Sequence, residues 1–277
     1  MTTRWCNYCG DIARAFKPRP GGLCNPCYKM DQAPAKHVIC QMANVLQQVS
    51  IPACIDISEL KRRVAPYMES RREFYSETGR GLYIEDEFSE YWTAKATKGT
   101  EIGRGSVGMD VKAENGDGID AMCVIMNRNG SNEKSLTQNF SVAGAQLDQL
   151  FDEGKDTEAL GLYLTGYSEK IKKVREENSL KDLFILAFVS TTTDVHAVCF
   201  QLFEDRILSA TSGGFVKGGD RNINANGFID PSEGNVKLYK SKKRLELRLN
   251  RAVIASPHTV TLWSLNPAVA PVAEPPA

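Results

Sequence analysis

The sequence predicts an α/β (α+β) fold, in which helices flank a mixed central sheet. Three observations lead to this class. Segments with helical periodicity alternate with short strand-like runs. Residues 183–189 form a continuous apolar run, as expected of a strand that is buried on both faces. Residues 115–118 read Asn-Gly-Asp-Gly, which is a turn signal typical of a β-hairpin.

The individual elements follow from residue spacing. Apolar residues recur at helical intervals in four segments, which are residues 35–49, 58–78, 131–153 and 157–177. Ser58 and Ser131 stand where helix caps are expected. Strand-like runs occupy residues 109–114, 119–126, 183–189, 195–203, 206–211, 245–249 and 259–265. Residues 266–277 contain four prolines and are predicted to be a disordered tail.

Composition excludes several classes of protein. Of the 277 residues, 42% are hydrophobic and 25% are charged, which are ordinary values for a globular protein. No apolar run approaches the ~18 residues that a membrane-spanning helix needs. The first residues contain no apolar signal core. We therefore expect a cytoplasmic protein without a membrane partner.

The neutral total charge conceals an uneven distribution. Lys and Arg balance Asp and Glu at 34 each, but residues 1–80 carry +5, residues 81–160 carry −8 and residues 161–277 carry +3. Carboxylates therefore concentrate in the middle of the chain, between two basic parts. A neutral sum of this kind does not exclude a nucleic-acid partner.

Four cysteines near the N-terminus have the spacing of a zinc site. Cys6 and Cys9 form one Cys-x-x-Cys pair, and Cys24 and Cys27 form a second pair after fourteen residues. Each short pair can present two thiolates to one tetrahedral ion. The segment resembles a zinc ribbon or zinc knuckle with a structural Zn²⁺. The sequence as a whole therefore predicts three parts: a zinc module at residues 1–32, a main domain at 33–265 and the tail at 266–277.

The densest polar cluster lies around the predicted hairpin. Asp110, Lys112 and Glu114 alternate along the first strand, and Asp120 begins the second. Carboxylates on adjacent strands can hold Mg²⁺ through oxygen. A bound Mg²⁺ polarises a phosphate and activates water, while a lysine offsets the charge of the transition state. These residue types predict phosphodiester hydrolysis.

The helix, hairpin, helix and buried-strand order, together with these acids, resembles the PD-(D/E)xK nucleases, the restriction-endonuclease-like family. The resemblance implies that Asp110 and Asp120 are the metal-binding acids, and it implies catalytic Mg²⁺. The lysine expected two residues after Asp120 is Met122. Lys112 or Lys134 is then the cationic partner, with Glu114 or Glu133 assisting. A further register pairs Asp110 and Lys112 with an upstream acid, either Asp86 or Glu101.

A basic run near the C-terminus is the candidate surface for DNA phosphates. Residues 236–251 contain seven basic residues and one acid. Such groups supply affinity without reading sequence, although lysines also protect the edge strands of sheets. The candidate contacts are Lys240, Lys242, Lys243, Arg244 and Arg248.

The expected function is that of a Mg²⁺-dependent DNA endonuclease resembling a type II restriction enzyme. Cleavage of both strands of double-stranded DNA favours a homodimer. The alternative is a non-catalytic zinc-ribbon protein that binds DNA or regulates another protein.

Overall fold

The computed structural model divides the chain into two compact units, Met1–Asn44 and Val45–Ala277. The structure describes residues 44–78, 82–102, 108–136, 144–216 and 222–265, and the backbone of residues 4–5 and 12–13. In the first unit, β1 (Arg4–Trp5) and β2 (Ile12–Ala13) pair in antiparallel fashion. The expected zinc ligands Cys6, Cys9, Cys24 and Cys27 and the expected tail at 266–277 lie outside the described residues.

The second unit is built on a mixed sheet. Its strand order is β15 (Val260–Ser264), β10 (Asp194–Leu202), β9 (Leu183–Ser190), β6 (Gly118–Asn127), β5 (Val111–Lys112) and β4 (Thr100–Glu101). In addition, β3 (Leu46–Val49) pairs with β10, and β7 (Gly130–Ser131) pairs with β6. The pairing of β6 with β9 is parallel, whereas the other pairs of this sheet are antiparallel.

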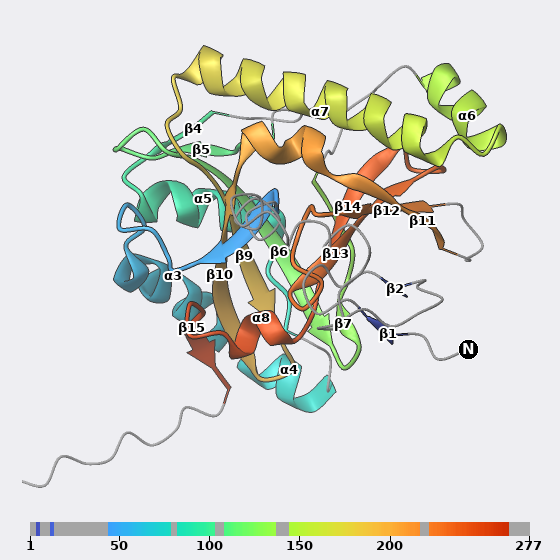
Figure 1. Ribbon diagram of the computed structural model, residues 1–277. Coiled ribbons are helices and arrows are strands. Elements are labelled where there is room, and N and C mark those ends of the chain that lie inside the picture. The colour runs from blue at the N-terminus through green and yellow to red at the C-terminus, as the bar shows by residue number, and fades with distance from the viewer. Residues whose placement is uncertain are drawn as a thin grey trace, which may run out of the picture. The chain divides into compact units, whose positions relative to one another are not determined.

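Helices cover both faces of this sheet (Figure 1). On one face, α3 (Ile57–Glu69) and α5 (Asp86–Ala96) enclose a core that contains Trp92 and Phe188. On the other face, α6 (Gly144–Asp152) and α7 (Asp156–Asn178) enclose a second core around Tyr163. The short helix α4 (Arg72–Thr78) follows α3 and buries Tyr75 in the first of these cores. The structure therefore confirms a mixed α+β fold whose sheet is flanked by helices.

A second, antiparallel sheet completes the core on the α7 side. Its order is β11 (Thr211–Val216), β12 (Asn222–Asn226), β13 (Gly234–Tyr239), β14 (Arg244–Leu249) and β8 (Lys134–Ser135). Apolar residues of β12, β13 and β14 belong to the same core as α7. The 3₁₀ helix η3 (Glu204–Ser209) precedes β11 in the chain, and α8 (Ala252–Ala255) follows β14. None of the helices in the described ranges is long and apolar enough to cross a membrane.

Several predicted elements match those of the structure. The expected hairpin at residues 109–126 forms as β5 and β6, and the helix expected at 157–177 is α7. The apolar run at 183–189 is β9, which is buried throughout, as its composition indicates. Local patterns are strong in these segments, because turn residues or unbroken periodicity delimit each of them.

Other predictions were wrong where distant pairing overrides local periodicity. Residues 131–136 were expected to begin a helix, but they form β7 and β8. Residues 46–49 were expected to be helical, but β10 pairs with them as β3. Most of residues 206–211 lies in η3 instead of a strand. The helix expected at 58–78 is divided into α3 and α4. The cap of α3 is Asp56 instead of Ser58, because the Asp56 carboxylate accepts hydrogen bonds from the backbone N–H groups of Ser58 and Glu59.

The buried face of the sheet provides a test of core packing. Leu186 on β9 is fully buried, whereas the Leu208 side chain of η3 is 57% exposed. We expect Leu186→Ala to lower the free energy of unfolding by ~2–5 kcal/mol, since it removes buried methyl groups and leaves a cavity. The matched change Leu208→Ala should cost about 0.5 kcal/mol or less. Urea unfolding measures both, and equal losses would contradict the burial of β9.

Candidate functional site

A gap in strand pairing organises the candidate site. β5 pairs only with the first residues of β6, at Gly118 and Ile119, and β7 pairs only with its last residues. Between them, backbone N–H groups on one edge of β6 bind side chains instead of a neighbouring strand. The three hydrogen bonds are Ala121 N–H to Asp110 Oδ2 at 2.8 Å, Cys123 N–H to Asp86 Oδ1 at 3.3 Å and Ile125 N–H to Asn132 Oδ1 at 2.7 Å.

Asp110 and Asp120 form a pair at this edge. The two carboxyl groups lie close enough together to interact directly, so each affects the pKa of the other. Burial raises the pKa of Asp120 well above its usual range, and the charge of Asp110 raises it further. Burial also raises the pKa of Asp110, although the Ala121 N–H opposes this shift. The two acids predicted from the sequence are therefore in direct contact.

Helix α5 adds two further acids. Asp86 lies in its first turn and Glu90 one turn later, so both side chains lie on one side of the helix. Burial and the charges of Asp110 and Asp86 raise the pKa of Glu90 to about 7. Sequence reasoning named Asp86 only as an alternative and missed Glu90. A run of acids before Trp92 and Ala96 is the signal for a helix N-terminus that would have placed Glu90 here.

Lys134 brings a positive charge to the acids. Its strand, β8, pairs with β14 of the second sheet. The Lys134 ammonium donates to both carboxylate oxygens of Asp86, at 2.8 Å each. The charge of Asp86 in turn raises the pKa values of Glu90, Asp110 and Asp120. Of the two candidate lysines, Lys134 is therefore the one with a contact in the acidic group.

The other three candidates of the predicted nuclease site have different surroundings. The Lys112 ammonium donates to the carbonyl oxygen of Asn178 at the end of α7, at 2.7 Å. Glu133 accepts a hydrogen bond from the hydroxyl of Tyr239 on the second sheet. Glu114 is exposed and lines a pocket that neither Asp110 nor Asp120 lines.

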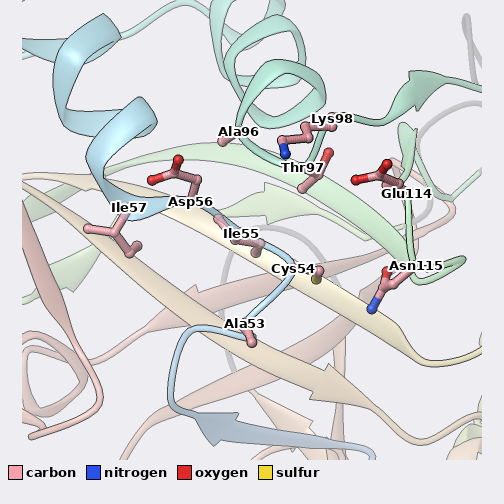
Figure 2. Close-up of a pocket in the computed structure, with 10 residues that line it drawn as sticks. All are labelled: Ala53, Cys54, Ile55, Asp56, Ile57, Ala96, Thr97, Lys98, Glu114 and Asn115. Atoms are coloured by element: carbon pink, nitrogen blue, oxygen red, sulfur yellow. The ribbon is translucent and has the colours of Figure 1, made fainter.

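That pocket has a volume of about 520 Å³ and lies between the start of α3, the end of α5 and the β5–β6 turn (Figure 2). Figure 2 shows the carboxylates of Asp56 and Glu114 and the amine of Lys98 around it. Burial and the charge of Asp117 raise the pKa of the Cys54 thiol to about 11. Cys54 is therefore a neutral thiol near pH 7, which argues against a thiolate nucleophile here.

The basic run is partly charge-compensated within the chain, since three carboxylates face its five named cations. Each residue of the run that sequence analysis named has an intramolecular partner. These contacts are Lys240 with Asp152, Lys242 with Glu246 at 2.9 Å, Lys243 with Asp148 at 2.6 Å, Arg244 with Glu246 at 2.7 Å, and Arg248 with the Asn129 carbonyl at 2.8 Å. Phosphates would have to compete with these partners.

The acids suit a hard cation in type, although they are not a complete ligand shell. Within the residues that the structure describes, no group of three or more His, Cys, Asp or Glu side chains lies close enough to hold a metal ion. The backbone amides that bind Asp110 and Asp86 belong to Ala121 and Cys123, which lie two residues and ~7 Å apart on β6. Mg²⁺ commonly uses only one or two carboxylates and completes its shell with water and substrate phosphate. The Asp110–Asp120 pair fits that requirement.

The raised pKa of Glu90 predicts how stability depends on pH. Its pKa is about 7 in the folded chain and 4.5 in an ordinary glutamate, so the folded state binds the proton more tightly. The contribution of Glu90 to stability is therefore lost as pH rises from about 4.5 to about 7. We expect Glu90→Gln to become increasingly more stable than wild type across this range. Urea unfolding in EDTA at pH 5, 6, 7 and 8 measures the difference.

Glu77→Gln is the control, since it removes an exposed carboxylate from α4, away from these acids. A difference between Glu90→Gln and wild type that stays constant from pH 5 to pH 8 would contradict the raised pKa.

Comparisons of the chain with models of protein families, with curated proteins and with solved structures gave no match.

Proposed function

We propose that the second unit is a metal-dependent DNA endonuclease of the PD-(D/E)xK type. The observation that carries the proposal is the contact between Asp110 and Asp120 at the open edge of β6. Part of the order of elements also supports it: helices α3 to α5 precede the antiparallel strands β4, β5 and β6, and helices α6 and α7 precede strand β9, which is parallel to β6. Strands β7 and β8 replace the start of the helix that the resemblance expects after the hairpin.

In this proposal Lys134 replaces the missing lysine of the motif. Met122, which occupies the expected position, is only 5% exposed and packs in the core with α7. A lysine at this position would carry its charge into the apolar core beside α7 and lose hydration. Lys134 reaches the acids from β8 and is held by Asp86. Lys112 is the weaker candidate, because its amine is bound at the end of α7.

Asp110 and Asp120 would hold Mg²⁺, which polarises a phosphate and activates water when it is bound. The Ala121 N–H orients Asp110, and both carboxylates would have to be deprotonated to act as ligands. Lys134 supplies the positive charge that offsets the charge developing on phosphate. Glu114 and Glu133, the other expected helpers, have no contact with this pair in the described chain, so we give Glu90 that place instead.

The second candidate is a non-catalytic zinc-ribbon protein that binds DNA or regulates another protein. It is favoured by the incomplete ligand shell among the described residues and by the ion pair that holds Lys134 on Asp86. In the nuclease proposal double-stranded DNA is the partner, and cutting both of its strands favours a homodimer.

Plasmid cleavage with Mg²⁺ or Mn²⁺ tests the nuclease. We expect Asp110→Asn, Asp120→Asn and Lys134→Ala each to lower the cleavage rate by ~100-fold or more, because each removes a metal ligand or a charge that stabilises the transition state. Lys112→Ala, which removes the other candidate amine, should retain cleavage within about threefold. Protein that binds DNA but never cuts it would exclude the enzyme. Loss of cutting in Lys112→Ala alone would exclude Lys134.

We also propose one structural Zn²⁺ per chain, held by Cys6, Cys9, Cys24 and Cys27, since two such pairs form a tetrahedral thiolate site. Elemental analysis of purified protein should find about one zinc per chain. Cys6→Ser and Cys24→Ser should lower that content, whereas Cys54→Ser, outside both pairs, should not. Zinc retained in Cys6→Ser and Cys24→Ser would contradict this ligand set.

A further inference from the structure

Helices α3 and α5 together present aromatic rings to solvent. Phe88 and Tyr91 of α5 are 40% and 43% exposed. The Phe88 ring centroid lies 4.9 Å from that of Tyr67 on α3, and both rings contact the largely buried Trp92. We call Tyr67, Phe88 and Tyr91 the α3–α5 aromatic patch. Clustered exposed aromatic side chains are more informative about a binding surface than singly exposed ones.

Basic side chains lie over the rings of this patch. The guanidinium carbon of Arg71 is 3.8 Å from the Tyr67 ring centroid. Arg63 and Lys95 lie 5.3 Å and 5.4 Å from the centroid of Tyr91. Such cation–π contacts keep positive charge at the aromatic surface instead of extending it into water.

The patch retains an excess of positive charge. The Glu59 carboxylate is shared by Arg62 and Arg63, so one positive charge of this group is not balanced. Arg71 is balanced by Glu85 at 3.8 Å. Lys95 adds one positive charge and the exposed Glu87 adds one negative charge. The net charge of these side chains is +1, from four basic groups, Arg62, Arg63, Arg71 and Lys95, and three acids, Glu59, Glu85 and Glu87.

This combination suits unpaired nucleotides better than a protein partner. Charged side chains are depleted from the centres of protein interfaces, whereas here ionised groups surround the two exposed rings. Proteins that bind single strands combine aromatic rings, on which bases stack, with basic groups for the backbone. Every base has a flat π-face, so stacking of this kind needs no particular sequence.

The position of the patch links it to the candidate site. Helix α5 carries Asp86 and Glu90 on one side and Phe88 and Tyr91 on the other. At ~1.5 Å per residue, Phe88 lies only ~3 Å further along the helix axis than Asp86. A strand that crosses the start of α5 would therefore meet the patch on one side of the helix and the acids on the other, ~10 Å apart.

We propose that the α3–α5 aromatic patch binds single-stranded DNA, with unpaired bases stacked on Phe88 and Tyr91. The choice of DNA rests on the proposed endonuclease function, while the preference for unpaired bases rests on the patch. The substrate would then include a single-stranded or locally opened segment beside the acids.

Binding of a fluorescently labelled oligo(dT) tests the proposal. Anisotropy is measured in EDTA with full-length protein that carries Asp120→Asn, so that no cutting occurs. We expect Phe88→Ala and Tyr91→Ala each to weaken binding by ~5- to 100-fold, the usual loss for one stacked base. Phe74→Ala removes a ring that is 49% exposed on α4, outside the patch, and should leave affinity unchanged. Phe88→Trp should preserve binding, because it keeps a ring.

An abasic oligonucleotide of equal length, with the same phosphates, should bind weakly and equally to wild type and to the patch variants. The proposal is overturned if Phe88→Ala and Tyr91→Ala bind oligo(dT) as wild type does, or if the abasic oligonucleotide binds wild type as tightly as oligo(dT). Patch variants that dissociate a dimer without changing the affinity for oligo(dT) would assign the surface to a protein contact.

Plasmid cleavage separates this inference from the proposed function. If the protein cuts plasmid but the patch variants bind oligo(dT) as wild type does, only the inference is overturned. If binding of oligo(dT) depends on the patch but the protein never cuts, only the proposed function is overturned.

Discussion

The open edge of β6 is the constraint on which the candidate site depends. Buried backbone N–H groups need acceptors, and β5 is too short to supply them beyond Ile119. Asp110 and Asp86 supply them instead, from two different elements. The sheet thereby gathers carboxylates that would otherwise repel one another, because each hydrogen bond from an amide offsets part of that repulsion. A longer β5 would complete the ladder and exclude both acids.

The parallel pairing of β6 with β9 explains why this site is partly dehydrated. Parallel neighbours require a crossover, and α7 provides it across one face of the sheet. Asp120 alternates with Ile119 on β6 and shares the face of Met122, which packs in the α7 core. The charge of Asp120 helps to raise the pKa of Tyr167 on α7. The crossover that completes the fold is therefore also what raises the pKa of Asp120 by burial.

Sequence alone predicted the parts of the fold that local patterns encode. The Asn-Gly-Asp-Gly turn and the apolar run of β9 are complete signals within a few residues, and they placed Asp110 and Asp120 on adjacent strands. Ser131 and Asn132 carry a helix-cap pattern, but the Asn132 side chain binds Ile125 N–H and the Ser131 hydroxyl binds Leu249 N–H. Those partners are distant in sequence, so spacing did not predict them. The run of acids that begins α5 is a local signal for a helix N-terminus, but the contact of Glu90 with the other acids depends on how α5 packs on β6.

The choice between the two lysines shows the same limit at the level of chemistry. Lys112 is two residues from Asp110, and its strand position directs its amine to the end of α7. Lys134 is more distant in sequence, yet the pairing of β8 with β14 carries it to Asp86. The positive charge beside the acids thus depends on the second sheet, because β6 itself carries the buried Met122 where the motif has its lysine. A change in the register of β8 on β14 by one residue would direct Lys134 to the opposite face and leave Asp86 without its ion pair.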